Sequence, residues 1–124
     1  MCSCLGKSII YFELSTNTSN IQIKVKGWKQ IAQDSTGKYS LYSNGEFAEV
    51  RCVRTTSWCD GTIREATTSF IPSEYRPPHG ANTVDSNHNT YASINNSNGK
   101  IYHKSLTGGV YEGEIYWTII YRLQ

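Results

Sequence analysis

Apolar and polar residues alternate along much of this chain with the two-residue period of a β-strand. Residues 20–26 show this most clearly, because isoleucine and valine fall on one face and glutamine and lysine on the other. Such a segment predicts a strand with one face on a core and the other in water. Comparable apolar or alternating segments predict strands at residues 8–14, 38–43, 46–55, 62–70, 90–95, 100–104 and 114–121.

The segments between the predicted strands contain residues that favour turns. Asn44-Gly45 and Asn98-Gly99 are pairs typical of tight hairpins, in which positive φ angles are needed. Residues 80–89 are mostly polar, with Val84 as an apolar anchor, and predict a loop or a short edge strand. About eight to ten short strands joined in this way predict an all-β sandwich or barrel in one domain.

Residues 70–78, FIPSEYRPP, hold all three prolines of the chain. Proline fixes φ and has no N–H group, so it does not fit the middle of a hydrogen-bonded sheet. The residue before a proline is biased toward extended geometry. We therefore expect a rigid, extended crossing between two halves of the β domain.

The motifs around this crossing occur in an order that resembles the receptor-binding head domains of tailed bacteriophages. Pro72-x-x-Tyr75-Arg76-Pro77 is similar to the proline crossing of that family. The Gly27-Trp28 pair upstream and the Asn98-Gly99 turn downstream match the family in order. The chain departs from the family at Ser73-Glu74, where a glycine is more usual in the second position.

The resemblance covers residues 27–121 and carries expectations about architecture. It implies a jelly-roll-like antiparallel β-sandwich assembled as a homotrimer. It also implies that residues 27–124 form a head-like sandwich, preceded at residues 1–26 by N-terminal strands or a neck-proximal segment.

The closing predicted strand is apolar on both sides, so both of its faces need cover. We expect one face to pack on the core and the other to meet a neighbouring subunit. Combined with the implied trimer, this predicts four interface residues: Ile115, Trp117, Ile119 and Tyr121.

Charge and chain composition exclude several classes of function. A formal net charge of +2 is too small for a nucleic-acid-binding surface. No apolar run reaches the ~18 residues of a membrane span, and the first residues lack the features of a secretory signal. We therefore expect synthesis in a host cytoplasm, no membrane insertion and four free thiols. The cysteines are Cys2, Cys4, Cys52 and Cys59.

No pattern of catalytic or metal-binding residues is evident. The chain lacks a G-x-S-x-G nucleophile elbow and a CxxC pair, and its three histidines do not have the spacing of metal ligands. Glu112 and Glu114 are spaced like a carboxylate pair, but a solvent-facing strand edge explains both. The sequence predicts a non-enzyme without a metal or an organic cofactor.

The polar loops do contain groups that suit a saccharide. An aromatic ring can stack on the apolar side of a sugar, and planar polar side chains can bind its hydroxyl groups. Each such residue can also be explained as an ordinary turn or surface residue. The candidates, which we expect at one end of the sandwich, are Trp58, Asp60, Asp85, Asn87, His88 and Tyr91.

These observations favour a phage receptor-binding protein that attaches the virion to a saccharide of the host cell surface. Its expected location is the tail tip or baseplate of the virion, in contact with other tail proteins. One alternative is a structural or accessory baseplate protein of the same fold without a sugar site. Another is an enzyme that trims host glycans.

Overall fold

The structure, a computed structural model, describes residues 8–13 and 22–124, with side chains described from Gly27 onward. Within these residues every regular element is a β-strand, apart from one 3₁₀ turn, η1 (Ser73–Tyr75). All pairs of strands are antiparallel. The prediction of an all-β, antiparallel domain is confirmed.

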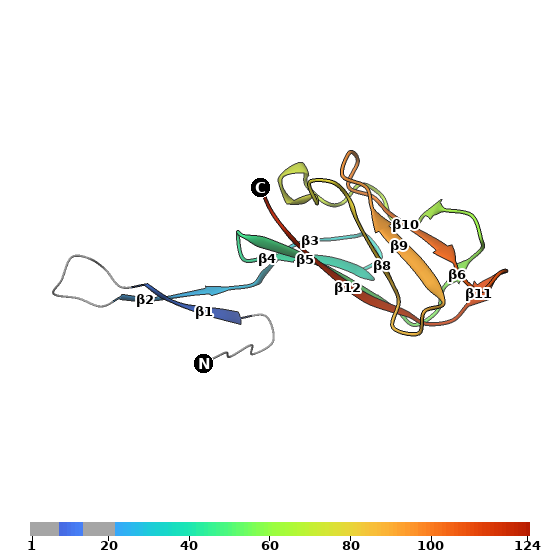
Figure 1. Cartoon of the computed structure of the whole chain (residues 1–124), viewed down its shortest axis with the longest axis horizontal. Coiled ribbons are helices and arrows are strands. Elements are labelled where there is room, and N and C mark those ends of the chain that lie inside the picture. The colour runs from blue at the N-terminus through green and yellow to red at the C-terminus, as the bar shows by residue number, and fades with distance from the viewer. Residues whose placement is uncertain (1–7, 14–21) are drawn as a thin grey trace.

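The strands of the described part form two four-stranded sheets and two small ones. The first large sheet has the order β12 (Ile115–Arg122), β5 (Phe47–Arg54), β4 (Tyr39–Ser43), β3 (Lys29–Gln33). The second has the order β7 (Arg64–Glu65), β10 (Ile101–Ser105), β9 (Thr90–Ile94), β8 (Ala81–Val84). The small sheets pair β1 (Ser8–Glu13) with β2 (Gln22–Gly27), and β6 (Trp58–Cys59) with β11 (Tyr111–Glu112). The β1–β2 hairpin and the β6–β11 pair lie at opposite ends of the domain (Figure 1).

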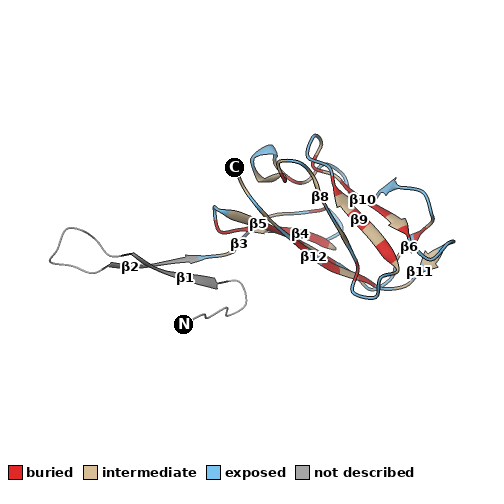
Figure 2. Ribbon diagram, viewed as in Figure 1, coloured by how far each residue is buried: buried red, intermediate tan, exposed pale blue. Residues whose placement is uncertain are grey.

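The two large sheets share one hydrophobic core, as expected of a sandwich. Leu41 and Val50 of the first sheet and Ile101 of the second are 0% exposed. In β4, β9 and β10, buried residues alternate with partly exposed ones, so each strand turns one face inward (Figure 2). Each fully buried side chain of this size contributes roughly 1.5–3 kcal/mol to folding.

The proline-containing connection joins β7 to β8, so it stays within the second large sheet rather than crossing between the two, and it gives that sheet a Greek-key order. Strands β8, β9 and β10 follow one another in the chain and pair as neighbours. Strand β7, which precedes the long proline-containing connection, pairs with β10 rather than β8. This is the arrangement of three consecutive strands with a fourth beside them.

The proline crossing is extended on both sides of η1. Pro72 has ψ 150° and Arg76 has ψ 148°, in agreement with the prediction. The Arg76 side chain holds the crossing in place, because Nε donates to the Ile71 carbonyl (2.9 Å) and Nη1 to the Ser97 carbonyl (2.8 Å). The short 3₁₀ turn between the two extended residues was not predicted.

Two predictions of local structure are wrong. Most of residues 62–70 is not a strand, because after Arg64–Glu65 the Thr67 hydroxyl accepts the Ile101 N–H in place of a backbone carbonyl. The Asn44-Gly45 hairpin has positive φ at Gly45 only. The Asn44 side chain instead accepts hydrogen bonds from the backbone N–H groups of Glu46 and Phe47.

The structure also corrects which side of β12 faces outward. Ile115, Trp117 and Ile119 are 0%, 6% and 7% exposed and belong to the core of their own chain. Tyr121 is half-buried and donates its hydroxyl hydrogen to the Tyr75 carbonyl at 2.6 Å. Since these side chains pack inside the domain, a neighbouring subunit would meet the alternate row, which includes Ile120 at 59% exposed.

The described helical segment is neither long nor apolar enough to cross a bilayer. Among the cysteines, Cys52 and Cys59 are free and buried. Cys2 and Cys4 lie outside the described residues.

Candidate functional site

Three polar connections meet at the end of the sandwich farthest from the β1–β2 hairpin (Figure 1). They are residues 57–62, 85–89 and 105–113, and we call them the distal end. Two adjacent amides join them: Ser105 N–H donates to the Asp60 carbonyl (2.6 Å), and Leu106 N–H donates to the Asn89 carbonyl (2.8 Å). The two loops that contain candidate saccharide-binding residues therefore lie side by side.

A pocket of about 300 Å³ opens beside β6 at this end, and we call it the distal pocket. Trp58 is 53% exposed at its rim, although it is among the largest apolar side chains of the protein. A ring in this position can stack on the apolar face of a sugar. The pocket is lined by Arg54, Trp58, Cys59, Arg64, Glu65, Ala66 and His103.

The charged groups at the rim are held by ion pairs. The Arg64 guanidinium binds both carboxylate oxygens of Asp60, at 2.9 Å from Nε to Oδ1 and 2.8 Å from Nη2 to Oδ2. This hydrogen bonding lowers the pKa of Asp60 and raises that of Arg64. Asp60, a predicted ligand residue, therefore acts by positioning Arg64 at the pocket.

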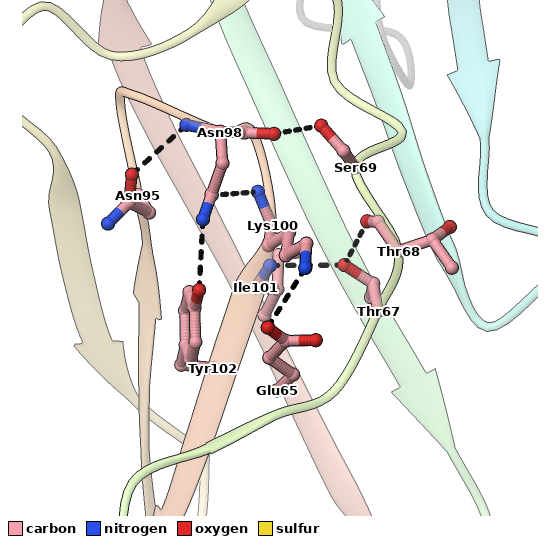
Figure 3. A network of polar contacts seen from close by, with 9 residues as sticks. All are labelled: Glu65, Thr67, Thr68, Ser69, Asn95, Asn98, Lys100, Ile101 and Tyr102. Atoms are coloured by element: carbon pink, nitrogen blue, oxygen red, sulfur yellow. Dashed lines mark hydrogen bonds and ion pairs between the residues drawn. The ribbon is translucent and has the colours of Figure 1, made fainter.

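Glu65 is fixed by a polar network around the β9–β10 turn (Figure 3). Its Oε2 lies 2.9 Å from Lys100 Nζ, and the Lys100 backbone N–H donates to Asn98 Oδ1 at 2.9 Å. Asn98 Nδ2 in turn donates to the Tyr102 hydroxyl at 2.9 Å. The network ties β7 to β10, so the rim at Glu65 has a defined position.

His103 lies in the floor of the distal pocket and is 5% exposed. Its Nε2 accepts a hydrogen bond from Trp117 Nε1 at 3.3 Å, and the Tyr39 hydroxyl lies 3.5 Å from the same nitrogen. Burial, with a smaller contribution from the Arg54 charge, lowers the pKa of His103 to about 4. The ring is therefore neutral at pH 7, and because Nε2 accepts, its proton is on Nδ1.

Arg54 stands beside this floor at the end of β5. Its Nη1 donates to the Tyr39 hydroxyl at 3.0 Å, and its guanidinium carbon lies 5.8 Å from the centre of the Tyr39 ring. Its Nε is buried without a hydrogen-bond partner in the part of the chain that the structure describes. The Arg54 guanidinium is thus held by one hydrogen bond, and some of its N–H groups have no acceptor among the described residues.

Asp85 does not have the role predicted for it. Its side chain is 2% exposed, and Oδ1 accepts the backbone N–H groups of Asn89 (2.7 Å) and Thr90 (3.2 Å). This is the local hydrogen bonding by which aspartate stabilises turns. Asp85 shapes the β8–β9 turn and does not face a ligand.

The other three predicted residues are accessible but lie outside the distal pocket. Asn87 and His88 are exposed at the tip of the β8–β9 turn, where His88 has φ 60°. Tyr91 is on the outward face of β9, with Lys104 Nζ 5.8 Å from its ring centre. Of the six candidates, only Trp58 and, through Arg64, Asp60 contribute to the pocket.

A larger groove, of about 660 Å³, runs between the proline crossing and the end of β12. It is lined by Pro77, Pro78, His79, Gly80 and residues 121–124. The Tyr121 hydroxyl in its wall is already bonded to Tyr75, and Arg122 pairs with Glu46 at 3.5 Å. The smaller distal pocket has the exposed ring and the unused donors, so we regard it as the candidate site.

Neither the sequence motifs nor the loop composition predicted four of the residues that line the distal pocket: Arg54, Arg64, Glu65 and His103. A signal for two of them was present, because Arg54 and His103 continue alternating rows whose other members are buried. No cluster of three or more histidine, cysteine, aspartate or glutamate residues that could hold a metal ion occurs among the described residues.

Comparisons with protein-family models, curated proteins and solved structures found no match to this chain.

Proposed function

We propose that this chain is a receptor-binding head domain of a tailed bacteriophage, which attaches the virion to a saccharide on the host cell through the distal pocket. The observation that carries the proposal is the pocket itself, in which the exposed Trp58 ring stands beside polar groups held in fixed positions. The order of motifs around the proline crossing supplies the link to phages.

The position of the pocket supports this use. The pocket is lined by Trp58 and Cys59 of β6, and the β6–β11 pair lies at the opposite end of the domain from β1 and β2 (Figure 1). A domain attached to the virion through residues 1–26 would therefore direct the pocket away from the virion. In this proposal the sandwich is jelly-roll-like, which the Greek-key order of the second sheet supports. Three copies assemble, and their weak single sites act together by avidity.

Substitution of Trp58 tests the proposal. Trp58→Ala should reduce adsorption of the protein to host cell walls by about ten-fold or more, since it removes the stacking surface. The melting temperature should change little because the ring is 53% exposed. The measurement is binding to immobilised cell-wall saccharides, with a thermal unfolding curve for each variant.

Val84→Ala is the matched control, because Val84 is 38% exposed on the edge strand β8 and does not line the distal pocket. It should leave saccharide binding unchanged. Unaltered adsorption of a folded Trp58→Ala protein would contradict the proposal. Failure of the native protein to bind any host saccharide would instead favour an accessory baseplate role.

A further inference from the structure

We infer that the saccharide bound in the distal pocket is anionic, and that its carboxylate or phosphate group is bound by Arg54 beside His103. This inference rests on the proposed function and adds the chemical class of the ligand. It follows from the charges, the unused donors and the size of the pocket.

Two of the three charged side chains that line the pocket already have partners of opposite charge. Arg64 is bound by Asp60, and Glu65 by Lys100. Arg54 has no carboxylate within 4.0 Å among the described residues. Within the described residues, Arg54 is therefore the charged side chain of the pocket lining that has no ion-pair partner.

The donors of Arg54 are also incompletely used. Nη1 donates to the Tyr39 hydroxyl, whereas neither Nε nor Nη2 has an acceptor in the described part of the chain. A partly buried guanidinium without an anion is unfavourable, because desolvation weakens its hydration and nothing replaces it. Because Nε is shielded from solvent, an anion in the pocket would bind the terminal Nη nitrogens, which can donate to the oxygens of a carboxylate or phosphate.

His103 provides a second donor beside the Arg54 guanidinium. Since Nε2 accepts from Trp117, the neutral ring carries its hydrogen on Nδ1, which has no acceptor among the described residues. The carboxylates of Asp34, Asp60 and Asp85 lie more than 4.0 Å from the Arg54 nitrogens. Asp34 and Asp85 raise the pKa of the Cys52 thiol, and Asp60 and Asp85 raise the pKa of the Cys59 thiol. None of these carboxylates contacts Arg54, so the anionic group of a ligand can pair with Arg54 directly.

The volume of the pocket favours a small charged unit. About 300 Å³ is at the lower end for ligand pockets and fits a single sugar residue with its acidic group better than a folded partner. Trp58 at the rim would contact the ring of the sugar while Arg54 binds the anion. A neutral sugar would contact the Trp58 ring but would provide no anion for Arg54.

The test compares glucuronic acid, glucose 6-phosphate and glucose as ligands of the full chain. Binding is followed by the ¹⁵N–¹H signal of the Trp58 indole, with the Trp28 indole as an internal reference outside the pocket. Both acids should bind about ten-fold or more tightly than glucose. Arg54→Gln should remove this preference, and Arg122→Gln, which changes an arginine at the opposite end of β12, should keep it.

Salt dependence of the native protein gives a second readout, which does not require the Arg54 variant to fold. Raising NaCl from about 20 mM to about 300 mM should weaken binding of both acids and leave binding of glucose unaffected.

Equal binding of all three sugars at Trp58, with no effect of salt, would overturn the inference but leave the proposed function standing. If none of the three sugars moves the Trp58 signal, both the inference and the proposed function are contradicted.

Discussion

At the scale of single residues, the surroundings of a side chain decide what it can do. Trp58 and Trp117 are the same residue type, but the first is 53% exposed and the second is 6% exposed. The first can meet a ligand, and the second donates to His103 and fixes its tautomer. The sequence places Trp58 in a polar loop and Trp117 in an apolar strand, but it does not show that Trp117 meets His103.

The buried His103 should make the stability of the fold depend on pH. Its pKa in the fold is about 4, below the ordinary value of 6.5, so the unfolded chain takes up the proton first as the pH falls. The stabilising effect of the neutral ring is complete above about pH 6.5 and is lost as the pH falls toward 4. The unfolding free energy should decrease by roughly 2–3 kcal/mol between pH 7.5 and 4.5 from this group alone.

Urea unfolding at both pH values measures this effect. His103→Gln should be less stable at pH 7.5 but show a smaller loss on acidification, whereas His79→Gln, at an exposed position, should behave like the native protein. All three proteins share the other titrating groups, including Glu49, whose pKa is raised by burial and whose effect has the opposite sign. Equal pH dependence in the native and His103→Gln proteins would contradict the prediction.

At the scale of elements, the proline crossing and the β9–β10 turn depend on each other. Arg76 reaches from the crossing to the turn and donates to the Ser97 carbonyl. Gly99, in the turn, has φ 69°, and a Cβ atom there would lie 2.5 Å from the Ile71 carbonyl oxygen and 2.6 Å from Arg76 Nε. Both the backbone angle and the close approach require glycine.

Gly99→Ala should therefore lower the unfolding free energy by ~3 kcal/mol, because it combines the cost of positive φ with a clash against backbone. Gly108→Ala is a matched control: its φ is 85°, but the space around it is open, so a loss of ~1 kcal/mol is expected. Denaturant unfolding of both variants provides the comparison. Equal losses would mean that the contact between the crossing and the turn is unimportant.

At the scale of the whole molecule, the outward face of the first sheet is the surface on which assembly can be tested. Ile120 on β12 is 59% exposed and Val53 on β5 is 57% exposed. The proposed trimer would cover apolar side chains of this kind, which single domains usually leave only in small patches.

Light scattering should give a mass of about three times 14.0 kDa for the native protein. Ile120→Lys should yield a folded monomer, because an unpaired charge is costly in an interface but harmless in water. Ile119→Lys should fail to fold, since Ile119 is 7% exposed in the core. A native monomer at micromolar concentration would count against the trimer.

Much of the architecture was determined by the sequence alone. Strands β4, β5, β9, β10 and β12 lie within a residue or two of their predicted bounds, since the two-residue period and the turn residues are local properties of the chain. The extended backbone around η1 followed in the same way from proline, which restricts its own φ and the residue before it. The exposed position of Trp58 in a polar loop was also predictable.

Only the tertiary structure decided which face of β12 is inside and which residues form the distal pocket. Both faces of β12 are apolar, so the local pattern contains no asymmetry to choose between them. Arg54 and His103 are distant in sequence, and they meet because their strands belong to sheets that pack face to face across one core. The binding capacity of the pocket therefore depends on the pairing of distant strands, which a periodic pattern along the chain does not specify.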